Sequence, residues 1–446
     1  MIDKAREIAL KTIVEIEKEE GYSNLVLNKV IKESKKQLTE KDISLISELV
    51  YGVITWKITL DEIIKKYSKI KLKKISIWIL NVLRIGIYQI IFLDKIPKSA
   101  AVNESVNLAK RYGHYASSNF VNAILRKVEK SDYEELKQIE NNEERISKMY
   151  SMPEWIIKEL KIGRDLPEVE EICKNLCKKP KINIRINKLK TNVEKLKKEL
   201  EKQKIEYKEI AKEIPEFLEL EKIKDIENNE LFKKGYFTIQ DISAGLTAKI
   251  LSPKENEIIL DSCSAPGGKT TYMAEIMNNK GKIIACDIYK HRLELINENA
   301  KRLGINIIET QEMDASKYKE ENKEKFDKIL LDVPCLGIGV IKRKPDIKWQ
   351  RKEEDIKEIS DSQKTILENC SKYLKKGGEL VYSTCSILEK ENKNVIEKFL
   401  ESNKNFEIIE IKAPEIFEKY CTKEGYLAIN PTEKNDGFFI CKLRKK

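Results

Sequence analysis

Four short apolar segments alternate with helical segments over residues 241–446, and this alternation limits the possible folds more than any other feature of the chain. The segments are EIILD at 257–261, KIIACD at 282–287, KILLD at 328–332 and ELVYS at 379–383. Strands that alternate with helices form a mostly parallel sheet with helices on both faces. We therefore predict a Rossmann-like α/β domain over 241–446.

Residues 1–135 have a different pattern, in which apolar side chains recur three and four positions apart and no run alternates with period two. This pattern predicts an all-α domain. Its most apolar stretch, residues 75–93, contains Asn81, Arg84 and Gln89. Three polar side chains fit a buried core helix better than a membrane span.

Residues 145–240 show a mixed pattern, which predicts a small α+β subdomain. INIRIN at 182–187 alternates as a strand does, VEKLKKELEKQ at 193–203 has a helical period, and YFTIQ at 236–240 suggests another strand. The preceding residues, 131–150, are acidic and polar and suit a linker or an exposed helix. Two or three domains are also what a chain of 446 residues requires.

The chain is basic, with 85 Lys and Arg against 74 Asp and Glu, a net charge of +11. Residues 1–130 hold 24 basic and 15 acidic side chains, which accounts for +9 of that charge. The excess favours a polyanion as partner, although lysine is abundant throughout the chain. The densest cluster either contacts phosphates or forms a solvated face; it consists of Lys65, Lys66, Lys69, Lys71, Lys73 and Lys74.

The nine cysteines are scattered, and the opening residues MIDKAREIAL carry acids rather than an apolar signal core. We therefore expect a cytoplasmic protein with free thiols and no membrane association. The chain has no CxxC pair and its only histidines are His114 and His291. For that reason we expect neither a metal site nor a histidine-based triad. We infer no obligate protein partner.

A glycine-containing segment, Asp261–Thr270 (DSCSAPGGKT), lies between an apolar strand and a helix. Small residues there let the backbone approach a ligand and direct N–H groups at it. A P-loop would need glycine six positions before Lys269, where Cys263 stands, and no GxGxxG turn is present. Asp287 ends the next strand, where a Rossmann-like fold presents an acid to ribose hydroxyls, and Asp314 follows the strand after that. Acids at successive strand ends predict an adenosine-type pocket.

Two cysteines follow later strands, Cys335 in the run Asp332-Val-Pro-Cys and Cys385 in the run Tyr-Ser-Thr-Cys. Both strand ends should open into the same crevice. A sheet cysteine is most often a small buried hydrophobe, and we interpret Cys286 and Cys370 in that way. Polar neighbours make this interpretation weaker for Cys335 and Cys385.

Methylation of cytosine at carbon 5 is a reaction that would use this whole set. A thiolate that adds to carbon 6 turns carbon 5 into a nucleophile, and an acid must contact the ring at N3 and the exocyclic amine. The electrophile is a methyl sulfonium held in an adenosine pocket, and a base must remove the carbon-5 proton before the thiolate leaves. Asp332 fits the acid, one cysteine the nucleophile and the other the group that helps to release the product.

The motifs resemble those of the RNA cytosine-C5 methyltransferases. The segments that carry this resemblance are DSCSAPGGKT, DVPCLGIGVIKRKPDIKW, YSTCSILEKEN and the terminal DGFFICKL. QDISAG around Gln240 and Asp241 resembles the segment just before the family's catalytic sheet, and IRINKLKT, which contains Arg185 and Asn187, resembles its RRM-like (ferredoxin-like) subdomain. IPKSAAVNESVNLAKRYGHYASSNFVNAILRKV resembles a NusB-type RNA-binding domain. This combination is characteristic of the bacterial Sun/Fmu-type (RsmB-like) enzymes, which methylate cytosine in 16S rRNA.

The resemblance implies a NusB-like helical domain over 1–135, a ferredoxin-like subdomain over 145–240 and a class I methyltransferase domain over 241–446. It implies transfer of a methyl group from S-adenosylmethionine to carbon 5 of a specific cytosine in 16S rRNA through a covalent cysteine–C6 adduct. Cys385 then corresponds to the nucleophile and Cys335 to the residue that aids product release. DNA cytosine methyltransferases lack the Thr-Cys thiol, so the presence of both favours RNA. Methylation of tRNA or 23S rRNA, or a non-catalytic role as an RNA-binding assembly factor, are the alternatives.

The resemblance also assigns binding residues by position. The cofactor would contact Cys263, Ser264, Ala265, Pro266, Gly267, Gly268, Lys269, Asp287, Asp314 and Asp332. We add Arg185, Lys342, Arg343 and Lys344 as RNA-contacting residues. The chain departs from the family at Ser264, where alanine is usual, and at Lys344, where histidine is common.

Overall fold

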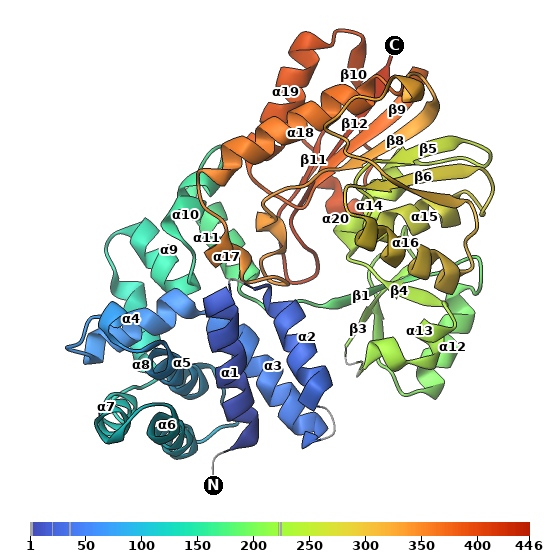
Figure 1. Cartoon of the computed structure of the whole chain (residues 1–446). Helices are drawn as coiled ribbons and strands as arrows, with labels where there is room; N and C mark the ends of the chain where they lie inside the picture. The colour runs from blue at the N-terminus through green and yellow to red at the C-terminus, as the bar shows by residue number, and fades with distance from the viewer. Residues whose placement is uncertain (1–2, 20, 35–36, 222, 224) are drawn as a thin grey trace. The chain divides into compact units, whose positions relative to one another are not determined.

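The computed structural model describes residues 3–19, 21–34, 37–221, 223 and 225–446 (Figure 1). Their contacts divide them into two compact units. Unit 1 extends to Lys178 and also includes Ile341–Lys352, whereas unit 2 comprises Lys179–Val340 and Glu353–Lys446. The predicted boundaries at 135, 145 and 240 remain a prediction.

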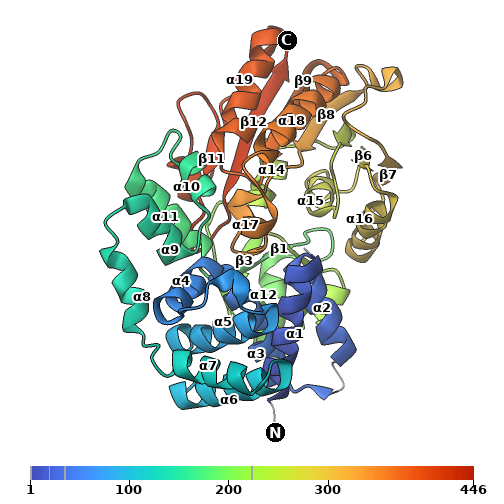
Figure 2. The same ribbon diagram turned by 60° about the vertical axis from the view of Figure 1, so that its left-hand side comes forward.

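Unit 1 is helical, which confirms the predicted class. Its helices are α1 (Lys4–Glu19), α2 (Ser23–Ser34), α3 (Glu40–Thr55), α4 (Lys57–Tyr67), α5 (Ile77–Phe92), α6 (Lys98–Tyr112), α7 (Tyr115–Leu125), α8 (Ser131–Glu135), α9 (Asn142–Tyr150), α10 (Glu154–Leu160), α11 (Leu166–Leu176) and α17 (Ile347–Gln350). Helix α5 is the core helix expected from its sequence, and it packs against α1, α3, α4, α6 and α7. Figure 2 shows α5, α6 and α7 side by side.

The polar side chains of α5 find partners within unit 1. The Arg84 guanidinium donates from Nε to Asp61 Oδ1 at 2.7 Å and from Nη1 to Glu17 Oε1 at 2.9 Å, and Asn81 Nδ2 donates to Glu17 Oε2 at 2.7 Å. A buried cation is tolerated when it is paired in this way. Among the described residues no single helix is long and apolar enough to cross a membrane. Helices α3 and α4 together are long and apolar enough by length and composition only, and they are bent by 77° at the break between them.

Residues 131–150, expected as a linker or an exposed helix, form α8 and α9, and Ile146 and Met149 of α9 are buried. This stretch is therefore a packed part of unit 1. The neighbouring α10 and α11 belong to the same unit.

Unit 2 begins with the ferredoxin-like subdomain. Its elements are β1 (Ile182–Ile186), α12 (Val193–Lys202), β2 (Tyr207–Glu209), β3 (Phe217–Leu220), α13 (Glu230–Lys233) and β4 (Phe237–Ile239). The strands form an antiparallel sheet in the order β2-β3-β1-β4. Ile184, Ile186 and Phe237 lie in its core with Leu196 and Leu200 of α12. The strand and helix segments predicted at 182–187, 193–203 and 236–240 are confirmed.

The rest of unit 2 is the predicted α/β domain. Its elements are α14 (Ile242–Leu251), β5 (Ile258–Asp261), α15 (Gly268–Ile276), β6 (Lys282–Asp287), α16 (Lys290–Leu303), β7 (Ile308–Glu312), β8 (Phe326–Asp332), α18 (Asp355–Ser371), β9 (Leu374–Thr384), α19 (Lys393–Ser402), β10 (Phe406–Ile408), α20 (Glu415–Glu418), β11 (Leu427–Ile429) and β12 (Phe438–Lys445). The sheet order is β10-β12-β9-β8-β5-β6-β7, with β11 beside β12. Strands β5 to β9 are parallel, and β10 and β12 are antiparallel.

Successive side chains of the central strands enter opposite cores. Ile259, Leu330 and Val381 pack toward α14, α15 and α16, whereas Leu260 and Tyr382 pack toward α18 and α19. Figure 1 shows these helix groups on the two faces of the sheet. Burial on both faces explains why the strands are continuously apolar in the sequence.

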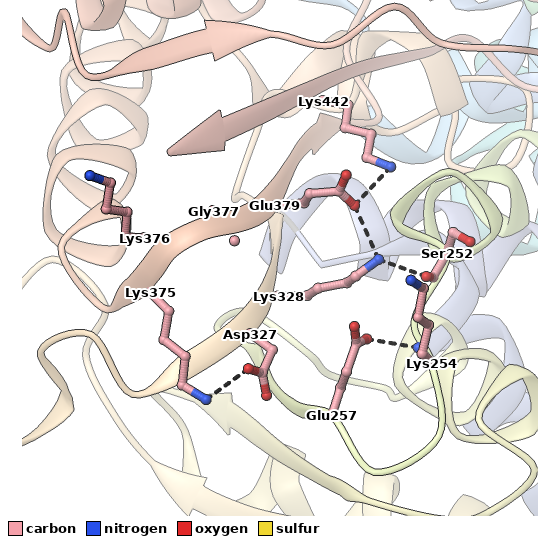
Figure 3. Close-up of a pocket in the computed structure, with 11 residues that line it drawn as sticks. Ser252, Lys254, Glu257, Asp327, Lys328, Lys375, Lys376, Gly377, Glu379 and Lys442 are labelled. Atoms are coloured by element: carbon pink, nitrogen blue, oxygen red, sulfur yellow. Dashed lines mark hydrogen bonds and ion pairs between the residues drawn. The ribbon is translucent and has the colours of Figure 1, made fainter. Parts of the chain in front are cut away.

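Ion pairs close the amino edge of the sheet around a cavity of about 450 Å³ (Figure 3). Lys328 Nζ donates to the carbonyls of Leu251 and Ser252 at 2.8 and 2.7 Å and pairs with Glu379 at 3.1 Å. It therefore caps the free carbonyls at the end of α14. Glu379 also pairs with Lys442 at 3.0 Å, and these lysines hold the pKa of Glu379 at about 2 against the effect of burial. The cavity lies at the edge opposite the two predicted thiols.

Candidate active site

The glycine-containing segment forms the turn from β5 to α15. Gly267 has φ 95°, a conformation that favours glycine, and its Cα faces α16, where an added Cβ would lie 3.2 Å from Ile296. The Ala265–Pro266 peptide bond is cis. Ser264 donates from its backbone N–H and from Oγ to the carbonyl of Cys286, each at 2.8 Å. This fixes the turn against β6.

Asp287 and Asp314 lie at the carboxyl edge of the same sheet, as predicted. Asp287 ends β6, accepts from the N–H of Tyr289 at 3.0 Å and pairs with Arg292 at 3.2 Å. Arg292 also donates to the carbonyl of Ala265 at 3.4 Å, so it links the acid to the glycine turn. Asp314 follows β7 and is held by the N–H and Oγ of Ser316 at 3.0 and 2.6 Å. These hydrogen bonds lower the pKa of Asp314.

Asp332 ends β8, and both of its oxygens are engaged. Its Oδ2 accepts from Lys269 Nζ at 2.6 Å and its Oδ1 accepts from Ser383 Oγ at 2.8 Å. Burial opposes the charge of Lys269, but the negative charge of Asp332 outweighs it and raises the pKa of this lysine, with a smaller contribution from Cys385. The Lys269 ammonium also lies 5.1 Å from the Phe438 ring centre. Asp332 is thus held as an oriented carboxylate.

The two predicted thiols meet. Cys335 Sγ and Cys385 Sγ are 3.0 Å apart, and both side chains are partly exposed. The hydrogen bond to Cys385, together with burial, raises the pKa of the Cys335 thiol well above its usual value. At neutral pH Cys335 therefore keeps its proton and can donate it to Cys385 Sγ.

A close backbone contact supports the loop of Cys385. The N–H of Gly339 donates to the carbonyl of Cys385 at 2.9 Å, and the N–H of Gly437 donates to the carbonyl of Gly339 at 2.9 Å. A Cβ on Gly339 would lie 2.3 Å from the Gly437 carbonyl oxygen and 2.8 Å from that of Cys385. Only glycine fits there. The terminal DGFFICKL motif reaches the site through Gly437.

Three residues of this edge were not among the predicted cofactor contacts, although Asp261 begins the predicted turn segment. Asp261 at the end of β5 is buried; its Oδ2 accepts from Thr270 at 2.7 Å, but its Oδ1 has no partner. Burial raises the pKa of Asp261 to about 7. Ile288 and Tyr289, directly after Asp287, are 48% and 55% exposed although they are large and apolar. Two large side chains directly after an acid at a strand end are visible in the sequence and could have indicated a planar apolar ligand.

The residues present fit S-adenosylmethionine. An unpartnered buried carboxylate oxygen and three carboxylates suit an ammonium and a sulfonium, and Asp287 suits ribose hydroxyls. The exposed Ile288 and Tyr289 suit an adenine face. The small residues of the turn leave room for close backbone contact. Among the described residues, no group of three or more His, Cys, Asp or Glu side chains is arranged to hold a metal ion.

Arg185 does not lie where RNA could reach it, and the predicted RNA contact is wrong for this structure. Its side chain is 0% exposed. It pairs with Glu275 at 2.8 Å, donates to the carbonyl of Gly268 at 2.9 Å and to Thr271 Oγ1 at 3.2 Å, and stacks on Tyr272 at 4.5 Å. Arg185 therefore ties β1 to the first turn of α15. The sequence of an alternating strand does not show which face of the sheet an arginine side chain occupies.

The basic run after Cys335 also differs from the expectation. Lys342 is 7% exposed and Arg343 is partly exposed, so Lys344 alone of the three is fully accessible. Lys348, four residues further along, is 2% exposed and donates to the carbonyls of Thr55 and Ser151 at 2.6 and 2.9 Å. Burial lowers its pKa. This part of the run is an anchor within unit 1.

The lysine cluster of unit 1 is exposed at all six positions. Lys65 pairs with Glu62 at 3.0 Å, and Lys66 pairs with Asp132 at 2.6 Å and with Glu135. The remaining four, Lys69, Lys71, Lys73 and Lys74, have no ion pair among the described residues. They lie between α4 and α5 and offer free charge to a phosphate backbone.

Comparisons with known proteins identify the family of the chain. A family model described as "16S rRNA methyltransferase RsmB/F" matches residues 248–444, one described as "NusB family" matches 3–130, and an RsmF/B-like ferredoxin-like domain matches 152–227. The chain is 38% identical to "Probable ribosomal RNA small subunit methyltransferase B" of Bacillus subtilis, over 99% of this chain and 98% of that one. The crystal structure of PH0851 superposes with a TM-score of 0.82 at 27% identity over 100% of both chains. That of NSun6 from Pyrococcus horikoshii with SFG, a cofactor analogue, gives 0.59 at 27% identity over 66% of this chain and 98% of the other.

Proposed function

The chain belongs to the RsmB/F family and is an S-adenosylmethionine-dependent RNA methyltransferase, and from this premise we propose that it methylates carbon 5 of a specific cytosine in 16S rRNA through a covalent Cys385–C6 adduct. The observation that carries the proposal is the pair of thiols 3.0 Å apart beside the Lys269–Asp332 ion pair. Two thiols and an oriented acid are what a reaction that adds a nucleophile and later expels it requires.

Cys385 is the nucleophile in this proposal. Its Sγ lies 3.0 Å from Cys335 Sγ, beside the Lys269–Asp332 ion pair. Its sulfur bonds to carbon 6 of the base, and the electron pair of the C5–C6 double bond moves toward carbon 5. S-adenosylmethionine supplies the electrophilic methyl group that carbon 5 takes. A base then takes the carbon-5 proton, the electron pair of that C–H bond restores the C5–C6 double bond, and the electron pair of the breaking S–C6 bond returns to the sulfur of Cys385.

Asp332 orients the base. Each carboxylate oxygen has two lone pairs, so the hydrogen bonds from Lys269 and Ser383 leave capacity for the exocyclic amine and a protonated N3. Cys335 lies within reach of the breaking S–C6 bond and aids release. The cofactor would be held by the turn Cys263–Lys269 and by Asp287 and Asp314.

The RNA backbone would be bound by unit 1 through its unpaired lysines, and by Lys344. The comparisons support an rRNA substrate because the relatives are named as small-subunit rRNA methyltransferases. Reversing the charge of Lys69, Lys71, Lys73 and Lys74 to Glu should weaken binding and lower the slope of log K against log salt by up to about 3–4. An unchanged slope would exclude this cluster from the interface.

The test is methyl transfer from labelled S-adenosylmethionine to 16S rRNA, mapped by nucleotide, with a denaturing gel for covalent RNA–protein adducts. Cys385→Ala should be inactive and form no adduct, whereas Cys335→Ala should accumulate one. Cys421→Ala, at an exposed thiol outside the site, is the matched control. Methylation of tRNA or 23S rRNA alone would retain the mechanism and refute the target. No methylation and no cofactor binding would favour an assembly factor.

A further inference from the structure

A buried carboxylate lies behind the two thiol loops and has no part in the reaction described above. Glu391 ends a short 3-10 helix, Glu389–Glu391, and is 0% exposed. It lies in the polar segment LEKENK, whose composition predicts an exposed surface. Burying a carboxylate costs several kcal/mol unless hydrogen bonds satisfy it, so its partners show what it stabilises.

The partners of Glu391 come from both thiol loops. Its Oε2 accepts from the N–H of Leu336, the residue after Cys335, at 2.8 Å. Its Oε1 accepts from the Oγ of Ser386, the residue after Cys385. One carboxylate therefore joins the two short loops that carry the reacting sulfurs.

A third donor and a neighbouring amide complete the arrangement. Gln363 Nε2 of α18 donates to Glu391 Oε2 at 3.2 Å and to the carbonyl of Pro334 at 2.9 Å. Asn392 accepts from Thr384 Oγ1 at 2.5 Å and donates to the carbonyl of Ser386 at 3.0 Å, so it holds the Cys385 loop from both sides. Leu336, Ser386 and Gln363 each donate to the carboxylate of Glu391, which suits the ionised form.

We propose that Glu391 is the positioning residue of this site: it holds the loops after Cys335 and Cys385 together so that both sulfurs meet the same base. The catalytic meaning of this inference rests on the proposed function, but the spacing of the thiols belongs to the fold alone. A displacement of about 1 Å in a reacting group can cost about 100-fold in rate. A shared anchor keeps the two sulfurs in register through attack and release.

The first experiment measures the spacing without any catalysis. Diamide takes two electrons and two protons from the thiols and leaves a Cys335–Cys385 disulfide, whose rate of formation reports how often the sulfurs meet. Glu391→Leu keeps the volume and removes both acceptors, so we expect disulfide formation at least about 10-fold slower than in the wild type. Glu391→Gln can keep an oxygen toward Leu336 and turn its amide toward Ser386 Oγ, which can accept. It should stay within about threefold. Glu397→Gln, on the exposed face of α19, is the matched control.

The second experiment measures catalysis on the same variants. Glu391→Leu should lower kcat by about 100-fold and slow adduct formation with RNA that carries 5-fluorocytosine. The Kd for S-adenosylmethionine should not change, because none of these bonds reaches the cofactor turn. Glu391→Gln should recover kcat to within about tenfold. A merely structural role would instead lower kcat, cofactor affinity and thermal midpoint together.

The outcomes separate the two proposals. Disulfide formation and kcat of Glu391→Leu at wild-type values would overturn the positioning role. If that variant does not fold, Ser386→Ala removes one of the two loop contacts, and unchanged disulfide and adduct rates in it would overturn the role equally. A wild type that forms the disulfide at the expected rate but makes no 5-methylcytosine would refute the proposed function and leave the positioning of the thiols standing.

Discussion

Replacing Arg185 by methionine tests whether this residue holds the cofactor turn or contacts RNA. The Arg185–Glu275 pair is 0% and 3% exposed, so the variant leaves Glu275 buried without a cation. It also removes the donors to the Gly268 carbonyl and to Thr271 Oγ1. Loss of one partner of a buried pair costs about 3–5 kcal/mol. For a unit of this size that lowers the thermal midpoint by roughly 10 °C.

A second substitution should recover most of that loss. Replacing both members of a buried pair by apolar side chains is often neutral, so Arg185→Met with Glu275→Met should be more stable than Arg185→Met alone by about 2–3 kcal/mol. Urea unfolding of the wild type, both single variants and the double variant gives this coupling energy. The measurement needs no RNA and no activity.

The stability penalty of Arg185→Met should also depend on pH. Burial is the largest influence on Glu275 and raises its pKa, while Arg185 acts against it. A carboxyl whose pKa is higher in the folded state loses stability as the pH rises through that range. Without Arg185 nothing offsets the effect of burial to the same extent, so the pKa of Glu275 rises further. The stability penalty of Arg185→Met should therefore be smaller at about pH 5, where Glu275 is more readily protonated, than at about pH 8.

A measurement of RNA binding can refute this account of Arg185. If Arg185 is buried as described, the slope of log K against log salt should be the same in wild type and Arg185→Met below the unfolding temperature. A slope lower by about 1 with unchanged unfolding would show a phosphate contact and refute the structural account. Arg185→Lys should recover only part of the stability, because lysine cannot reproduce the forked contact with Glu275.

Three further outcomes follow from the site. The folded-state pKa of Asp261 is about 7, well above the unfolded value, so this group makes the cofactor-free protein lose stability as the pH rises from about 4 to about 7. The free energy of unfolding in urea should decline less steeply over this range in Asp261→Asn. An identical pH curve in the variant would contradict the raised pKa. Gly339→Ala places a Cβ 2.3 Å from a carbonyl oxygen of Gly437, which should cost about 1–3 kcal/mol and slow adduct formation; wild-type kinetics would show that the loop can move. Mild oxidation should inactivate the enzyme by joining Cys335 to Cys385, with dithiothreitol restoring activity; mass spectrometry should find the loss of two hydrogens in that pair, and full activity in a protein shown to carry the bond would exclude both thiols from the reaction.

The sequence was sufficient for the frame of the site because its signals are local. Three of the predicted strands end at the same residues in the structure, namely Asp261, Asp287 and Asp332. Parallel strands bring their carboxyl ends to one edge, so acids and cysteines far apart in the chain could be placed together. The thiol pair was predictable for the same reason.

Three residues show where such inference fails. Arg185, Lys348 and Glu391 are charged, stand in polar or alternating runs, and are buried. Charge predicts exposure only on average, and the partners that permit burial come from distant segments: Glu275, the carbonyls of Thr55 and Ser151, and the two thiol loops. Sequence composition does not reveal such partners. The misplaced RNA contacts share this cause.

Neighbouring groups distinguish the two thiols of the site. A reaction that adds one sulfur and later releases it needs one cysteine ionised and the other protonated at the start. The hydrogen bond to Cys385 and burial raise the pKa of Cys335, with smaller contributions from Glu391 and Asp332. Cys335 can donate its proton to Cys385 Sγ across the 3.0 Å between the two sulfurs. In this arrangement Cys335 keeps its proton and Cys385 is the thiol that attacks, so Cys335→Ala should still form the adduct with RNA, and its failure to form one would refute this assignment.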